Sequence, residues 1–206
     1  MPKQRTSIPK AISSRVLREF RHGCAICGRD EPQIHHIDKN PANNQVDNLL
    51  PLCPNCHLID QHDPTAPSDP LKLKLFRRYR DPAILSSQFH PLYLRLRFLL
   101  TLEETYEWTE TLACTAELMA FVRALNMGDF YSGRIRDLLA VPQLDPPSFD
   151  ASQAQRADFE ARRQSAFKDS LIQNREKATR LVIEMLRYQD WPERMAMSKP
   201  RGGYAT

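Results

Sequence analysis

The sequence predicts an α+β protein in which a small unit of two short strands and a helix precedes a mostly α-helical C-terminal region. Two Cys-x-x-Cys pairs lie in the N-terminal third, and they enclose strand-like segments separated by turn-forming residues. A unit this small needs a staple, which a zinc ion held by four cysteines provides. Beyond Ala83, apolar residues recur at helical spacing over long stretches. The hydrophobic content of 41% supports a packed core.

The N-terminal segments predict the order helix, strand, loop, strand, helix. A helix is expected over residues 9–22, because a proline suits its first turn and apolar residues follow at helical spacing. Short strands are expected over 33–37 and 48–52, and the turn-rich stretch 38–47 between them predicts a loop. A second helix is expected to begin at Pro54.

The four paired cysteines predict a structural zinc site. Each Cys-x-x-Cys pair presents two sulfurs to one ion, so two pairs complete a closed tetrahedral site. A redox dithiol or an iron–sulfur cluster would also use such cysteines, but neither explains the histidines between the pairs. A zinc ion with four thiolate ligands is saturated, so catalysis would require a second metal. The predicted zinc ligands are Cys24, Cys27, Cys53 and Cys56.

The stretch CAICGRDEPQIHHIDKNPANNQVDNLLPLCPNCH combines CxxC, HHI, DNLL and CxxCH in that order. It resembles the HNH endonuclease family, in the subclass with a four-cysteine zinc site, over about residues 10 to 65. The resemblance implies a ββα-metal core in which His35 and His57 bind a divalent cation such as Mg²⁺, Mn²⁺ or Ni²⁺. It also implies that His36 is the general base and that Asn48 fixes the loop and helps to orient His36.

Strand geometry and proton chemistry agree with these roles. Successive side chains of a strand face opposite ways, so His35 and His36 cannot do the same task. A histidine near its ordinary pKa can take a proton from water at neutral pH. Lys39 departs from the resemblance, because the family often has glycine at that position.

Charge is concentrated in the part of the chain that carries the motif. Residues 1–80 hold 13 Lys and Arg against 8 Asp and Glu, whereas residues 81–206 hold 16 against 17. A basic surface beside the site suits DNA, and RNA remains open because no feature marks a 2′-hydroxyl reader. Residues 71–80 predict a short helix, although their alternation also permits a strand. The candidate phosphate-binding residues there are Lys72, Lys74, Arg77 and Arg78.

The C-terminal region predicts three helices, over 91–126, 129–141 and 151–188, with a linker at 142–147. This region is expected to bind a protein partner or a second copy of the chain. Cys114 is expected to be a buried small apolar residue. The buried face of the first of these helices is expected to contain Trp108, Leu112, Thr115, Met119 and Val122.

The sequence as a whole therefore predicts a metal-dependent HNH endonuclease that hydrolyses DNA. Small proteins of this build resemble effectors of bacterial anti-phage and restriction systems, by analogy alone. The alternative is a non-catalytic zinc adaptor that binds nucleic acid or a protein partner. No long uncharged apolar run and no apolar N-terminal core occur, so we expect a cytoplasmic protein without a membrane span. The predicted parts are a nuclease domain at 1–65, a linker and basic segment at 66–82, a helical domain at 83–190 and a disordered tail at 191–206.

Overall fold

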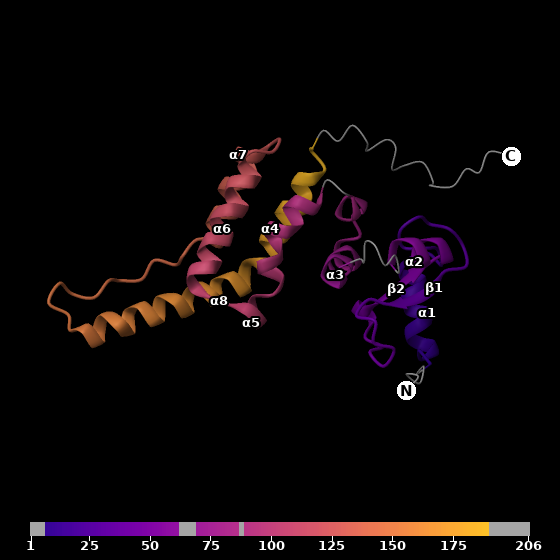
Figure 1. Ribbon diagram of the computed structural model, residues 1–206, viewed down its shortest axis with the longest axis horizontal. Coiled ribbons are helices and arrows are strands. Elements are labelled where there is room, and N and C mark those ends of the chain that lie inside the picture. The colour runs from indigo at the N-terminus through magenta and orange to yellow at the C-terminus, as the bar shows by residue number, and fades with distance from the viewer. Residues whose placement is uncertain (1–6, 62–68, 87–88, 190–206) are drawn as a thin grey trace. The chain divides into compact units, whose positions relative to one another are not determined.

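The computed structural model describes residues 7–61, 69–86 and 89–189, which belong to two compact units (Figure 1). The first unit reaches Leu85 and the second begins at Ser86. Residues 66–68 of the predicted linker and basic segment, and the whole predicted tail at 191–206, lie outside the described residues. The described chain is mostly helical with one small two-stranded sheet, which confirms the predicted mixture of helices and strands.

The sheet of the first unit is an antiparallel pair. Its strands β1 (Gln33–His36) and β2 (Leu49–Leu52) pair so that His35 lies opposite Leu50. The 3₁₀ turn η1 (Val46–Asn48) leads directly into β2, and α2 (Pro54–Gln61) follows it. All four residues of β2 are buried, so this strand forms the centre of the unit's core.

The first helix, α1 (Lys10–Glu19), packs against β2 and ends earlier than predicted. Arg21 and His22 both have positive φ, which turns the chain out of the helix. The amide of His22 donates to the carbonyl oxygen of Leu17, and that of Arg21 donates to Arg18. These bonds form a Schellman motif, which satisfies the last carbonyls of α1 and fixes its end.

The predicted basic segment is helix α3 (Pro70–Tyr79), and it is part of the first unit rather than a linker. Asp69 caps the helix by accepting from the amide of Leu71. Lys74 and Arg78 of α3 are exposed. The buried residues are Leu73, Leu75, Phe76 and Arg77. The short 3₁₀ turn η2 (Pro82–Leu85) then packs on α3 and closes the unit.

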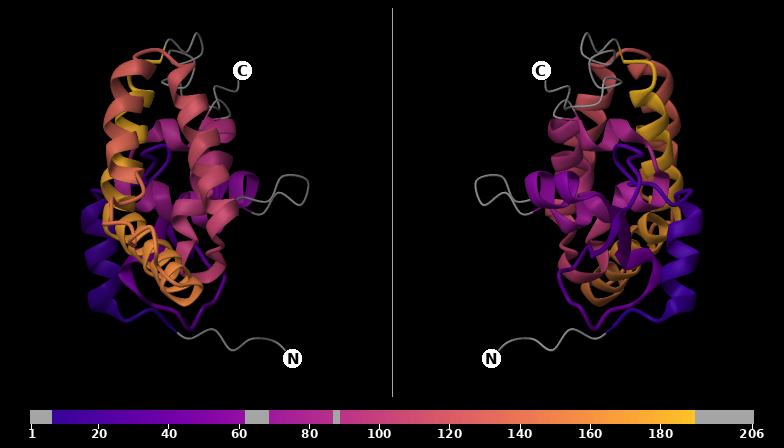
Figure 2. Two further views of the ribbon diagram at one scale, coloured as in Figure 1. Left: turned by 90° about the vertical axis from the view of Figure 1, so that its left-hand side faces the viewer. Right: turned by 90° about the vertical axis from the view of Figure 1, so that its right-hand side faces the viewer.

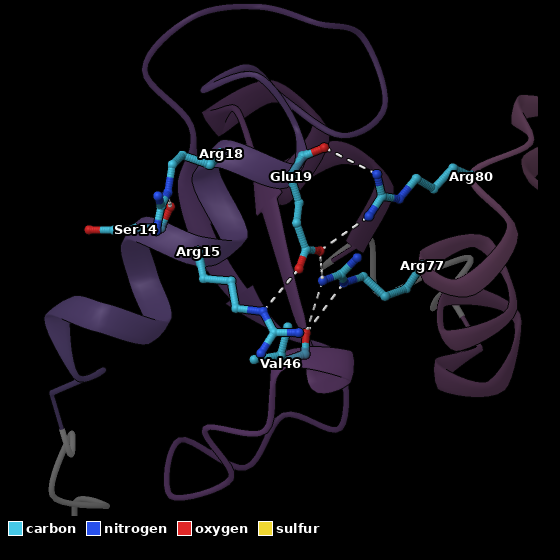
Figure 3. A network of polar contacts seen from close by, with 7 residues as sticks. All are labelled: Ser14, Arg15, Arg18, Glu19, Val46, Arg77 and Arg80. Carbon is cyan, nitrogen blue, oxygen red and sulfur yellow. Dashed lines mark hydrogen bonds and ion pairs between the residues drawn. The ribbon is translucent and has the colours of Figure 1, made fainter.

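Helix α3 is attached to α1 and η1 by a group of arginine contacts (Figure 3). Arg77 forms an ion pair with Glu19 and donates to the carbonyl oxygen of Val46 at 3.2 and 3.3 Å. Arg80 bonds both the carboxylate and the carbonyl oxygen of Glu19, each at 3.2 Å. Both guanidinium groups lie 5.0 Å from the centre of the Phe20 ring. The side chain of Arg77 is only 7% exposed, so Glu19 neutralises a buried charge.

We expect Glu19→Gln to lower the free energy of unfolding of the first unit by about 2 kcal/mol at neutral pH, because it leaves Arg77 without its carboxylate. Burial alone would raise the pKa of Glu19, but the hydrogen bond and charge of Arg77, followed by Arg80, bring it below the usual value of 4.5. A lowered pKa in the folded state means that this stabilisation is present above pH 4.5 and is lost as the pH falls through the folded-state pKa. Urea unfolding of the wild-type protein and of Glu19→Gln, at neutral and at acidic pH, measures the difference in their free energies of unfolding. Arg15→Gln is the matched control, since it removes an exposed partner of the same carboxylate; an equal loss in the two variants would contradict the role given to Arg77.

The second unit is a helical bundle in which α7 packs along α6 and α8, and α4 packs against α6 and α8 (Figures 1 and 2). Its helices are α4 (His90–Leu100), α5 (Leu102–Thr105), α6 (Trp108–Arg123), α7 (Gly128–Leu139) and α8 (Gln153–Leu186). Ser152 and Gln155 form a capping box at the start of α8. The first buried residue of α8 is Phe167, so its N-terminal turns extend beyond the bundle (Figure 1).

The prediction of one continuous helix over 91–126 was wrong. The helix is interrupted at Thr101 and again at Tyr106 and Glu107, and the Glu107 carboxylate caps α6 by accepting from two amides. Helix α6 buries Thr111, Leu118 and Val122. Val122 belongs to the predicted buried face, whose other residues, Trp108, Leu112, Thr115 and Met119, are half-buried.

A tight turn separates α6 from α7. A Cβ atom on Gly128 would lie 2.4 Å from the carbonyl oxygens of Val122 and Arg123, so only glycine fits there.

Cys114, which the sequence predicted to be buried, is half-buried in α6. Among the described residues, no helix combines the length and the apolarity that crossing a bilayer requires.

Candidate metal centres

The first cysteine pair lies on a tight knuckle that is tied to the sheet. The amide of Gly28 donates to the carbonyl oxygen of Cys24 at 2.9 Å, and the amide of Ala25 donates to that of Pro51 at 2.7 Å. A Cβ atom on Gly23 would lie 2.8 Å from the carbonyl oxygen of Gly28, so glycine allows the knuckle to close. The knuckle therefore holds its two thiols beside the end of β2.

The second cysteine pair completes a cluster of four sulfurs. Cys53 follows β2 and Cys56 lies in the first turn of α2, and all four Sγ atoms lie within 4.8 Å of one another. The Sγ atoms of Cys27 and Cys53 are 3.6 Å apart. Four sulfurs at about 2.3 Å from one zinc ion in tetrahedral geometry would be about 3.8 Å apart. The four cysteines are not disulfide-bonded, so their positions fit a structural metal ion such as zinc.

The thiols of this cluster differ in their acidity. Burial opposes ionisation of Cys53, but the amide of Cys56 and the neighbouring thiols lower the pKa of Cys53 to about 7. Burial, followed by the charge of Cys24, raises the pKa of Cys56. Four thiolates this close together repel one another strongly, and a divalent cation among them would remove that cost.

The structure brings His35 and His57 together. The side chain of His35 is 5% exposed on the inner side of β1, and His57 is half-buried in the first turn of α2. Their ring centres are 4.9 Å apart and the rings meet edge to face, at 75°. Within the described residues, the four cysteines are the only convergent group of three or more metal-binding side chains. A cation on the histidine pair would thus keep most of its coordination positions for water or phosphate.

His36 occupies the next position of β1 and is half-buried. Its Nε2 atom lies 3.0 Å from Oδ1 of Asn44. The sequence analysis gave the orienting role to Asn48 and did not identify Asn44. The one sequence signal for Asn44 is its place in the turn-rich loop after the histidine pair, a loop that offers several equivalent amides.

Asn48 is buried and forms hydrogen bonds to two residues of the loop. Its Oδ1 atom accepts from the amide of Asp38, and its Nδ2 atom donates to Oδ1 of Asp38 and to the carbonyl oxygen of Asn43, both at 2.9 Å. Burial alone would raise the pKa of Asp38, but the amide of Asn40, the side chains of Asn48 and Asn43 and the charge of Lys74 lower it. Asp38 is therefore ionised and serves as the centre of the loop. Lys39, at the departure from the family pattern, takes the left-handed conformation that glycine would favour, with φ of 59°.

The four predicted phosphate-binding residues of α3 have different surroundings. Lys74 and Arg78 are exposed on one side of the helix, and Lys72 is half-buried, which lowers its pKa. The guanidinium of Arg77 contacts the carboxylate of Glu19 and the carbonyl oxygen of Val46 and is buried. Arg77 is therefore not part of the exposed basic surface of α3. Helix α3 packs against η1, so it lies beside the end of the loop that follows His36.

Comparison of the chain with protein-family models, with curated proteins and with solved structures found no match.

Proposed function

We propose that the chain is a metal-dependent HNH endonuclease that hydrolyses phosphodiester bonds of DNA. The observation that carries the proposal is the meeting of His35 and His57, which come from a strand and a helix that are separated in sequence by the loop. The neighbouring His36 faces the other way on the same strand, as separate roles for the two histidines require. The order of elements around them, β1, loop, β2 and α2, supports this proposal.

In the proposed mechanism, His35 and His57 would hold a divalent cation, which supplies charge stabilisation for the phosphate and the leaving 3′ oxygen. His36 takes a proton from water as the water oxygen bonds to phosphorus and the bond from phosphorus to the 3′ oxygen breaks. The leaving 3′ oxygen takes a proton from solvent water. Consecutive Cα atoms are about 3.8 Å apart, and the proposal requires that the side chains of both residues reach one phosphate. The products would be a 5′-phosphate and a 3′-hydroxyl.

The zinc cluster has a structural part in this proposal. The carbonyl oxygen of Cys53 accepts from the amide of His57 at 2.9 Å, so the cysteine that ends β2 also fixes the first turn of α2. A metal ion among the four sulfurs would hold the knuckle, β2 and α2 together. It would thereby keep His57 in contact with His35.

Plasmid cleavage by the zinc-loaded protein tests the proposal. We expect nicking or linearisation with Mg²⁺, Mn²⁺ or Ni²⁺ and no cleavage with a chelator that removes these ions but leaves the zinc content unchanged. Titration with Mn²⁺ is expected to show a second metal site that His35→Ala weakens. A protein that retains zinc, binds no second metal and cuts neither DNA nor RNA would support the non-catalytic zinc adaptor instead. Cleavage of RNA alone would keep the enzyme and change its substrate.

The exposed lysine and arginine of α3 are proposed to contact the DNA backbone. We expect Lys74→Gln and Arg78→Gln each to weaken DNA binding severalfold and to reduce the slope of log K against log salt by about 0.9, the value for one lost phosphate contact. Fluorescence anisotropy at several salt concentrations measures both quantities. Lys177→Gln is the matched control, because it removes the same charge from an exposed position of the helical unit. An unchanged slope in both α3 variants would contradict this surface.

The helical unit is proposed to bind a protein partner or a second copy of the chain. Large apolar side chains are exposed near one end of its bundle, and they are Met127, Phe130 and Tyr188. The analogy to effectors of bacterial defence extends the proposal to anti-phage or restriction activity. Light scattering of the purified protein measures its mass and separates self-association from a requirement for another partner.

A further inference from the structure

The loop between β1 and β2 presents one side chain to His36. Oδ1 of Asn44 lies 3.0 Å from Nε2 of His36, and both side chains are half-buried. A neutral imidazole carries a hydrogen on one of its two nitrogens, and the hydrogen-bond partner of the ring decides which. The amide oxygen is an acceptor only, so it selects the form with hydrogen on Nε2. The lone pair is then on Nδ1.

The backbone on both sides of Asn44 is held. Asn43 donates from its side chain to Oδ2 of Asp38 at 2.7 Å, and its carbonyl oxygen accepts from Asn48. After Asn44, the amide of Gln45 donates to Oδ1 of Asn43 at 3.3 Å, and the carbonyl oxygen of Gln45 accepts from the amide of Asn48 at 2.9 Å. The buried Asn48 thus fixes the two residues that flank Asn44, and its influence on His36 passes through the loop.

We propose that Asn44 is a positioning residue that fixes the Nε2-protonated tautomer of His36 and the orientation of its ring, so that Nδ1 is the nitrogen that accepts the proton from water. The catalytic part of this inference rests on the proposed nuclease activity. The tautomer itself does not depend on that activity.

The experiment is a ¹⁵N NMR measurement of the His36 side chain in the full-length, zinc-loaded protein. At a pH where the ring is neutral, we expect the shifts of wild type to identify Nε2 as the protonated nitrogen. Asn44→Ala is expected to give a mixture of the two tautomers, whereas Asn44→Asp, which retains an acceptor of the same size, is expected to keep the Nε2 form. Gln45→Ala is the matched control, because its side chain is exposed and its bonds to the loop come from the backbone.

Cleavage kinetics supply the second measurement. We expect Asn44→Ala to lower kcat about 10- to 100-fold with little change in KM, the size of effect seen when an orienting partner is removed. Asn44→Asp is expected to recover much of this rate, because it retains an acceptor for the hydrogen on Nε2. A purely structural role in the loop would not link the recovered rate to a retained Nε2 tautomer.

The outcomes separate the two proposals. An unchanged tautomer in Asn44→Ala would overturn the positioning role, whatever the activity of the protein. A mixed tautomer with undiminished kcat would show that the contact is irrelevant to cleavage and would overturn the catalytic part. A wild-type protein that cuts no nucleic acid would overturn the nuclease proposal, and the NMR result would still decide the tautomer. If Asn44→Ala fails to retain zinc, the comparison of wild type with Asn44→Asp decides, and loss of the Nε2 tautomer in Asn44→Asp would overturn the positioning role.

Discussion

Replacement of His36 by alanine is expected to lower the rate of DNA cleavage by about 10³-fold, because a general base contributes 10²- to 10⁴-fold to such reactions. The side chain of His36 is half-buried at the end of β1 and lies outside the core. The variant is therefore expected to fold, to keep its zinc and to bind Mn²⁺ at His35 and His57. Plasmid cleavage under single-turnover conditions, together with zinc content, measures this combination of a lost rate and a preserved structure.

Two comparisons sharpen the experiment. His90→Ala removes an exposed histidine from the helical unit, so it should cut at the wild-type rate. Added imidazole should restore part of the rate of His36→Ala, because a small base in solution can replace the missing proton acceptor. Equal cleavage by wild type and His36→Ala would mean that another group is the base. Rescue of His35→Ala by imidazole, without rescue of His36→Ala, would reverse the roles of the two histidines.

The sequence predicted the parts of the site that depend on spacing along the chain. Two residues between paired cysteines are enough to converge on one ion, and alternation along a strand separates His35 from His36. The spacing within 71–80 also predicted a helix, now seen as α3. Each of these predictions depends on the geometry of a few residues that are neighbours in the chain, so the local sequence is enough to make it.

The features that the sequence did not predict depend on contacts between distant segments. Arg77 resembles any basic residue of an exposed helix until Glu19, far away in the chain, pairs with it. Asn44 is one of several amides in its loop, and only the folded course of that loop selects it for His36. The interruption before α6 arises because Glu107 caps a new helix, although its sequence has no glycine or proline to mark the break.

Loss of the metal ion from the four-cysteine cluster is expected to unfold the first unit and leave the second folded. Apparent binding free energies of structural zinc are about 10–16 kcal/mol, which is as large as the whole stability of a typical domain. Cys53→Ser should therefore abolish zinc retention, cleavage and the His35–His57 contact together. Cys53 is fully buried, and its carbonyl oxygen accepts from the amide of His57, so the same residue joins the four-cysteine cluster to the proposed catalytic site.

Limited proteolysis and circular dichroism of Cys53→Ser measure this outcome. We expect a protected fragment that begins near Ser86 and a retained helical signal, because the second unit has its own core of packed helices. Cys114→Ser is the matched control, since it removes a half-buried thiol from the helical unit and should keep both zinc and cleavage. Full zinc content in Cys53→Ser would contradict the four-cysteine site. Cleavage that survives complete loss of zinc would mean that the two proposed metal sites are independent. The zinc site would then not be needed to hold His57 beside His35.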